Sequence, residues 1–269
     1  MIRQDWLDEL GLEVPTTVDE WHEVLTAFKE KKGAEAPLCF DWTNFKDSNP
    51  IAFAFKVGTA NGTQFILDDE GKVAFAPAQE GYKEYLMTLN QWYEEGLIDR
   101  DIATLNGDQV TAKMTSDKAG ASVGWAASRM QLFMTSAQQT NPEYTLVATP
   151  TPTTEKGATP EYGYVENQFP DVAAAITSSC KNVELAAKFL DYGYSEAGHN
   201  LFNFGIEGVS YEMKDGKAEY TDVVTNNPDG WPLAQSLAKY IRANYNGPFI
   251  QDLNYLEQYL QLPTVKECP

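Results

Sequence analysis

The sequence predicts a mixed α/β protein, and two observations lead to this prediction. Short apolar runs typical of buried strands alternate with longer stretches whose apolar residues recur at helical spacing. The clearest strand pattern is residues 119–124 (AGASVG), a run of small residues ending in a valine and a glycine. A helix is expected to start near Arg129, with Ser128 as its N-cap. Trp125 is then expected at the carboxyl end of a buried strand, where open α/β sheets hold their ligands.

Two helices are expected near the start of the chain. Residues 3–10 form a short amphipathic helix that Gly11 ends. Thr17 and Glu20 form a capping box, in which each side chain satisfies a free backbone N–H group of the other residue. Behind the box, apolar residues fall at offsets 0, 3, 7 and 10, which is one face of a helix. They are Val18, Trp21, Leu25 and Phe28.

The next stretch adds three strand regions and two helices. Residues 37–40 are expected as a buried strand, followed by a polar and aromatic loop over 41–45. Residues 65–75 predict a hairpin with Gly71 in its turn, and 107–116 predict a helix. Residues 144–148 predict a further strand, and Phe40, Val123 and Val147 are all expected in buried strands. The helix over 80–95 carries an apolar stripe that we assign to core packing: Tyr82, Tyr85, Leu86, Leu89, Trp92 and Tyr93.

The last hundred residues continue the alternation. Residues 170–176 have the pattern of another buried strand, and Asn182 is the expected N-cap of the helix that follows. A second helix is expected around 196–202, and then a hairpin turning at Asp215-Gly216, a type I′ signal. Residues 231–262 predict two amphipathic helices.

Composition excludes several classes of function. With 269 residues, 43% of them hydrophobic, the chain is long enough for one large domain or two smaller ones. A formal charge of -19 argues against nucleic acid or an anionic membrane as a partner, because phosphate binding needs Lys and Arg. The three cysteines are far apart, and His22 and His199 are the only histidines. A disulfide framework, a histidine-rich metal site and a Ser-His-Asp triad are therefore not expected.

Several short stretches, in this order, carry a resemblance to a known family. They are 2–11 (IRQDWLDELG) with 15–21 (PTTVDEW), 69–73 (DEGKV), 93–99 (YEEGLID), 120–125 (GASVGW) and 205–211 (GIEGVSY). Together they resemble the family 1 extracellular solute-binding proteins of ABC importers. This group includes maltose-binding and alginate-oligosaccharide-binding proteins, and the likeness is greatest to lipoprotein-type members of Gram-positive bacteria.

The resemblance implies a periplasmic-binding-protein-like class II fold, in which two α/β lobes close on a ligand. Matched to it, residues 1–14 become a crossover segment at the hinge and 15–170 the second lobe. Residues 171–269 become a return segment, with helices and a hairpin, toward the first lobe. We therefore expect a fragment, mainly the second lobe with an incomplete first lobe.

The function implied by the resemblance is capture of a carbohydrate, most often an oligosaccharide, without chemistry. The expected partners are that small-molecule ligand and the membrane permease of an ABC importer. The expected location is the bacterial cell surface, with a lipid anchor in the full-length protein and its signal outside this chain. No cofactor and no catalytic residue is expected.

No metal is expected either. The alginate-binding branch of the family carries a calcium loop after the helix that corresponds to 18–31. Here residues 31–37 (KKGAEAP) offer one carboxylate beside two lysines, whereas calcium takes six to eight oxygen ligands.

The expected ligand contacts combine flat aromatic faces, which bury the C–H surface of a sugar ring, with polar groups for its hydroxyls. Trp42 and Trp125 both follow predicted strands and are the expected aromatic faces. The expected polar contacts are Asp41, Asn44 and Arg129, and the segment leading into the return strand adds Tyr162 and Tyr164. For each residue the alternative is an ordinary place in a surface loop or in the core. The other tryptophans, assigned to packing, are Trp6, Trp21, Trp92 and Trp231.

Two other classes of protein remain open. A glycoside hydrolase needs two carboxylates about 5–9 Å apart, one with a raised pKa; among 39 acidic residues no motif singles out a pair. A structural or protein-binding module fits the acidity but not the aromatic loops. If the chain is a fragment, we expect weak sugar binding and self-association through an exposed apolar face.

Overall fold

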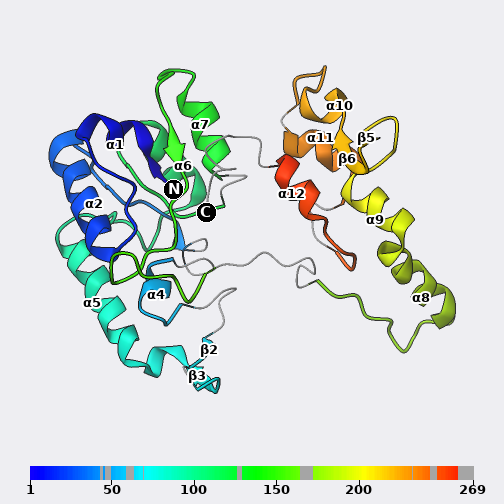
Figure 1. Ribbon diagram of the computed structural model, residues 1–269, viewed down its shortest axis with the longest axis horizontal. Coiled ribbons are helices and arrows are strands. Elements are labelled where there is room, and N and C mark those ends of the chain that lie inside the picture. Colours follow the sequence, from blue (N-terminus) through cyan, green and yellow to red (C-terminus); the bar gives the residue numbers. More distant parts are fainter. Residues whose placement is uncertain are drawn as a thin grey trace. The chain divides into compact units, whose positions relative to one another are not determined.

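The computed structural model in Figure 1 describes residues 1–42, 45, 50–58, 64–68, 70–125, 129–163, 172–231, 233–242 and 247–259. The chain divides into two compact units, Met1–Tyr164 with Leu262–Pro269 and Val165–Gln261. Both contain helices and strands, which confirms the α/β class. The assignment of 1–14, 15–170 and 171–269 to a hinge, a second lobe and a return segment stays a prediction.

Five extended segments lie side by side at the centre of the first unit. Leu38 forms parallel bridges to Ile98 on one side and to Ala121 on the other. Ala121 also bridges Ile2 in the antiparallel sense. β1 (Ile2–Arg3) then pairs antiparallel with β4 (Leu146–Val147). The expected strands at 37–40, 119–124 and 144–148 therefore occupy neighbouring positions in one small sheet.

Regular strand structure is shorter than expected at each of these positions. Phe40 is buried but lies two residues beyond the bridge at Leu38, outside any strand. Val123 is half-buried and also lies outside a strand, and Val147 is half-buried within β4. The prediction that all three lie in buried strands is wrong for Phe40 and Val123. The apolar run marks burial correctly, but the chain turns away soon after each bridge.

Two helices at the start of the chain, α1 (Gln4–Leu10) and α2 (Val18–Lys32), lie beside each other in Figure 1. α1 ends at Gly11, which is left-handed with φ of 65°. α2 begins with the expected capping box of Thr17 and Glu20. The face expected to be buried is buried, and the Trp6 ring meets Phe28 edge-on at 5.1 Å. The predicted helix over 3–10, its end at Gly11, the capping box and the buried face of α2 are confirmed.

Gly120 allows the central sheet to approach that ring pair. A Cβ atom at Gly120 would lie 2.3 Å from a ring carbon of Phe28 and 2.8 Å from one of Trp6. Only glycine fits at this close approach of backbone to aromatic rings.

A hairpin and a long helix follow α4 (Pro50–Ala54). The hairpin pairs β2 (Phe65–Leu67) with β3 (Val73–Phe75), and a 3₁₀ turn, η1 (Ala76–Ala78), leads into α5 (Glu80–Glu94). Tyr85 and Trp92 on α5 are buried, which confirms that this face packs on the core. Leu86 is half exposed, so its assignment to the core is wrong. The apolar stripe of α5 is wider than the face of the helix that contacts the core, so Leu86 at its margin is left partly in solvent.

Two shorter helices complete the described part of the first unit. α6 (Gly107–Thr115) is capped by Asn106, whose side chain accepts a hydrogen bond from Gln109 N. α7 (Gln131–Ala137) follows the 119–125 segment as expected. The predicted cap, Ser128, lies outside the described residues.

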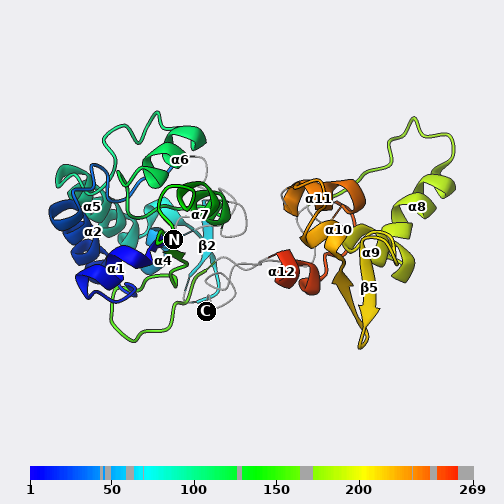
Figure 2. The same cartoon turned by 90° about the horizontal axis from the view of Figure 1, so that it is seen from above.

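The second unit consists of small helices around one hairpin, shown from above in Figure 2. Its elements are α8 (Val183–Asp191), η3 (Tyr192–Tyr194), α9 (Glu196–Asn203), β5 (Tyr211–Lys214), β6 (Lys217–Tyr220), α10 (Asp222–Thr225), α11 (Leu233–Tyr240) and α12 (Leu253–Tyr259). The Phe204 ring lies at its core, 5.7 Å from the ring of Tyr211 and 5.9 Å from that of Tyr220. Asp215 and Gly216 have φ of 50° and 79°, which confirms the type I′ turn.

The strand expected over 170–176 is not found in the part that the structure describes. Residues 172–176 have no regular structure and are exposed, while 170 and 171 lie outside the described residues. An apolar strand forms only beside a partner strand. In the described part of this unit, β5 and β6 pair with each other. Asn182 does cap α8, accepting from Leu185 N at 3.1 Å, yet no residue of α8 is buried.

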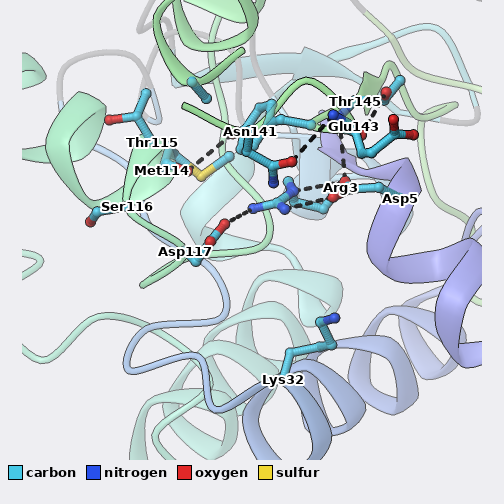
Figure 3. Close-up of polar contacts among 12 residues, drawn as sticks. Arg3, Asp5, Lys32, Met114, Thr115, Ser116, Asp117, Asn141, Glu143 and Thr145 are labelled. Carbon is cyan, nitrogen blue, oxygen red and sulfur yellow. Dashed lines mark hydrogen bonds and ion pairs between the residues drawn. The ribbon is translucent and has the colours of Figure 1, made fainter. Parts of the chain in front are cut away.

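A buried guanidinium joins three distant parts of the first unit, as Figure 3 shows. The Arg3 side chain is 1% exposed and makes two hydrogen bonds to Asp5, at 2.8 and 2.6 Å. It makes a third to Asp117 at 2.5 Å. Its Cζ lies 4.4 Å from the ring centroid of Trp6 and 4.0 Å from that of Tyr144. Burial acts to lower the pKa of Arg3, but the two carboxylates outweigh burial and raise it.

The cysteines of the described part are free thiols, Cys39 and Cys180. Cys39 is fully buried beside the central bridge at Leu38. Burial, followed by the negative charge of Asp99, raises the pKa of this thiol to about 12. Among the helices described, none is both long and apolar enough to cross a bilayer.

We expect Arg3→Met to destabilise the first unit by about 3–5 kcal/mol, because it leaves the partly buried Asp5 carboxylate without its partner. The measurement is urea unfolding followed by circular dichroism. Arg100→Met is the matched control, since Arg100 also stacks on a tyrosine, at 4.6 Å from Tyr93, but is exposed. A loss below about 1 kcal/mol for Arg3→Met, the usual value of an exposed pair, would contradict this account.

The capping box gives a pH dependence. Lys156 and the backbone and hydroxyl of Thr16 lower the pKa of Glu20 to about 2. A lowered carboxyl pKa stabilises the fold above the unfolded-state value, 4.5 for this group, and that stabilisation is lost as pH falls toward 2. We therefore expect Glu20→Gln to cost about 1–2 kcal/mol at pH 7 and progressively less from pH 5 to 3. Urea melts of both proteins at each pH measure the difference, and a gap that does not change with pH would contradict it.

Candidate ligand-binding site

Two exposed tryptophans follow neighbouring parallel segments of the central sheet. Leu38 and Ala121 pair in parallel, so the chain leaves both segments at the same edge. Trp42 follows the first segment and is 57% exposed, and Trp125 follows the second and is 43% exposed. The carboxyl edge of parallel strands is where α/β proteins place ligand contacts. Exposure of both rings at this edge is the arrangement that a ligand-facing role requires.

The tryptophans assigned to packing behave differently. Trp6, Trp21 and Trp92 are all buried. Trp231 in the second unit is half-buried, and the Lys239 ammonium lies 5.4 Å from its ring centroid.

The ring of Trp42 packs against Phe45, one of two buried phenylalanine rings that stack on each other. Phe45 stacks on Phe40 with ring centroids 4.0 Å apart and planes at 12°. The ring of Trp42 lies 5.9 Å from Phe45. The Phe45 N–H donates to the Asp41 carbonyl oxygen at 3.1 Å, which ties Phe45 to the residue directly before Trp42. Phe45 is 1% exposed, so its ring is part of the core while that of Trp42 is not.

Two of the expected polar contacts pair with each other. Arg129 Nη2 donates to Asp41 Oδ2 at 2.8 Å. The Asp41 side chain is 7% exposed and that of Arg129 19%. Arg129 Nη1 is also buried and has no hydrogen-bond partner among the residues that the structure describes. This pair connects the loop of Trp42 to that of Trp125.

Of the remaining expected contacts, the structure describes Tyr162. The Tyr162 hydroxyl donates to the Leu67 carbonyl oxygen at 2.8 Å, which places Tyr162 against the β2–β3 hairpin. Asn44 and Tyr164 lie outside the described residues. Phe45, which supports Trp42, is absent from the site expected from the sequence. The short spacing between Phe40 and Phe45, whose rings stack, could have indicated this role.

Two carboxylates of the described part, Glu20 and Glu95, have pKa values shifted in the direction opposite to that of a glycosidase acid. A glycosidase acid needs a raised pKa. The pKa of Glu20 is instead lowered, chiefly by Lys156, and that of Glu95 is lowered by hydrogen bonds from Gln91 and His22.

No group of three or more His, Cys, Asp or Glu in the described ranges is arranged to hold a metal ion. In the segment 31–37, the Glu35 carboxylate pairs with Lys118 at 3.2 Å. That this segment binds no calcium stays a prediction.

Comparison with known proteins identifies the family. The family of bacterial extracellular solute-binding proteins matches residues 1–200. The chain belongs to this family. The resemblance read from the short stretches is therefore confirmed.

Two curated relatives and two solved structures illustrate the likeness. The fructooligosaccharide ABC transporter substrate-binding protein FusA of Streptococcus pneumoniae serotype 4 is 29% identical over 214 residues, covering 77% of this chain and 38% of the relative. Lipoprotein LipO of Bacillus subtilis is 28% identical over 242 residues, covering 84% and 46%. The chain thus spans less than half the length of these relatives.

Among solved structures, alginate-binding protein AlgQ2 without calcium ion matches with a TM-score of 0.73 and 30% identity, covering 98% of this chain and 54% of that one. FusA of S. pneumoniae in complex with kestose matches with a TM-score of 0.63 and 24% identity, covering 97% and 52%. The second likeness concerns the fold alone. Both fit the expected periplasmic-binding-protein-like class.

Exposure separates the stability effects of two tryptophan substitutions. We expect Trp92→Ala to cost about 3–5 kcal/mol, because Trp92 is 1% exposed and its removal leaves a cavity. Trp125→Ala is expected to cost less than half as much, since much of its ring already faces solvent. Thermal and urea melts of the two variants decide the matter. If Trp125→Ala unfolds the protein as readily as Trp92→Ala, Trp125 belongs to the core.

Proposed function

We propose that this chain is part of the carbohydrate-binding component of an ABC importer. The observation that carries the proposal is the pair of exposed tryptophans that follow two parallel segments of the central sheet at the same edge, in a chain of the solute-binding family. Flat indole faces bury the apolar C–H surface of sugar rings, and two such faces suit an oligosaccharide better than a single ring. Fructooligosaccharide and alginate in the names of two relatives are consistent with this ligand class.

The proposal includes capture without chemistry and delivery to a membrane permease. It also places the protein at the bacterial cell surface, anchored through lipid in its full-length form, in line with a relative named as a lipoprotein. A carbohydrate hydrolase is the weaker alternative, because Asp41, the buried carboxylate between the two loops, is already paired with Arg129.

Self-association of this chain stays a prediction. The surface that favours it is on α8, where the side chains of Val183, Leu185 and Phe189 are largely exposed.

Weak binding is expected from the chain as it stands. Ligand pockets bury about 70–90% of their ligand, and two tryptophan faces on one unit cover less than that. We expect kestose or an alginate oligosaccharide to bind with a Kd near 1 mM, about -4 kcal/mol. Saturation-transfer NMR detects such binding, and chromatography of the same sample is expected to recover the sugar intact.

Substitution locates the binding and tests its nature. Trp125→Ala is expected to abolish the transfer signal, whereas Phe189→Ala, an equally apolar exposed ring in the second unit, should leave it unchanged. Shortened sugars would establish the hydrolase instead. No signal from any oligosaccharide at tens of millimolar would overturn the proposal, and micromolar binding by the monomer would refute the view that the chain offers only part of a cleft.

A further inference from the structure

We infer that Arg129 is a positioning residue that holds the Trp42 and Trp125 loops in one arrangement, and that it does not contact the ligand. This inference rests on the proposed function, in which those two rings hold a sugar. It replaces the expectation that Arg129 and Asp41 are polar ligand contacts.

The first support is the contact with the Trp42 loop. Arg129 Nη2 lies 2.8 Å from Asp41 Oδ2, and Asp41 is the residue directly before Trp42. The Asp41 side chain is 7% exposed, so its carboxylate has little surface left for a ligand. The backbone carbonyl of Asp41 accepts from Phe45 N, so Asp41 is also tied to the buried ring beside Trp42. A change in the position of the Arg129 guanidinium is therefore passed through Asp41 to Trp42.

The second support is the backbone connection to Trp125. The Arg129 N–H donates to the Trp125 carbonyl oxygen at 2.9 Å, and the Met130 N–H donates to the same oxygen at 3.4 Å. The backbone of Arg129 is therefore bonded to Trp125. The side chain of the same residue is bonded to Asp41, directly before Trp42.

The third support is the space made for the side chain by two glycines. A Cβ atom at Gly124 would lie 3.1 Å from Arg129 Cγ, and one at Gly107 would lie 2.7 Å from Arg129 Nη2. Gly107 is the first residue of α6, far from Arg129 in the chain. The guanidinium therefore occupies a fitted position between α6 and the Trp42 loop, where its conformation is restricted.

Stability alone does not account for this arrangement. Arg129 Nη1 is buried without a hydrogen-bond partner in the described part of the chain, a costly state for a charged donor. Apolar replacement of a buried pair is often neutral for stability. Loss of the pair is thus expected to affect the position of the two rings more than the stability of the unit.

The test follows the six tryptophans by ¹⁹F NMR in the full chain labelled with 5-fluorotryptophan, with resonances assigned by single Trp→Phe substitutions. The key variant is the double substitution Asp41→Leu with Arg129→Met, which replaces the buried pair with apolar side chains. We expect it to shift the Trp42 and Trp125 resonances toward the value of a free indole. The resonances of the buried Trp6, Trp21 and Trp92 and the melting temperature are expected to stay near those of the wild type.

Gly107→Ala provides a second route that changes no charge. Alanine is acceptable at the start of α6, but its methyl group displaces the guanidinium, so the same two resonances are expected to move. In the background of the double substitution, Gly107→Ala is expected to have no further effect. Gly163→Ala is the matched control, because the nearest atom to its added Cβ is 3.7 Å away.

The outcomes separate this inference from the proposed function. If the double substitution leaves the Trp42 and Trp125 resonances in place, or moves those of the buried tryptophans equally, Arg129 is not a positioning residue. Kestose and alginate oligosaccharide titrated into the wild type test the other claim. If neither sugar shifts the Trp42 or Trp125 resonance, the proposed function fails, whatever the double substitution shows.

Discussion

The first unit depends on the pairing of one buried cation. A guanidinium that is 1% exposed is tolerated only when its charge and donors are matched, and Arg3 achieves this with Asp5, Asp117 and two aromatic rings. Arg3 ends the extended segment whose other residue, Ile2, lies between Ala121 and Val147. Its Asp117 contact also fixes the chain just before the segment that leads to Trp125. The pairing of Arg3 therefore determines where the central segments lie.

Arg129 plays a comparable part at the opposite end of the same segments. Arg3 is bonded to Asp117, just before the 119–125 segment, and Arg129 is bonded to Trp125 at the end of that segment. Between them the chain runs past Ala121, which pairs with Leu38 and so sets the two tryptophan loops side by side. Two charged side chains thus control the geometry of a surface on which the exposed groups are apolar rings. The pairing of Leu38 with Ala121 aligns the two segments. The ion pairs of Arg3 and Arg129 fix the chain before and after the 119–125 segment.

Local signals in the sequence predicted local structure well. The capping box at Thr17 and Glu20 and the turn at Asp215-Gly216 each involve neighbours in the chain, so a few residues specify them. Features that depend on distant partners were missed or wrong. The Asp41–Arg129 pair joins residues 88 apart, and no spacing rule reaches that far. Residues 172–176 have the composition of a strand, but no strand of the described part lies beside them, because composition specifies burial and not the partner.

The reactivity of the buried Cys39 thiol reports local opening of the first unit. A thiol with a pKa near 12 and no exposed surface is inert toward disulfide reagents while the centre of the first unit is closed. Cys180 in the second unit is only half-buried. A thiol reagent added to the native protein is thus expected to react with Cys39 more slowly than with Cys180, and the rate at Cys39 measures the free energy needed to part Leu38 from its neighbours.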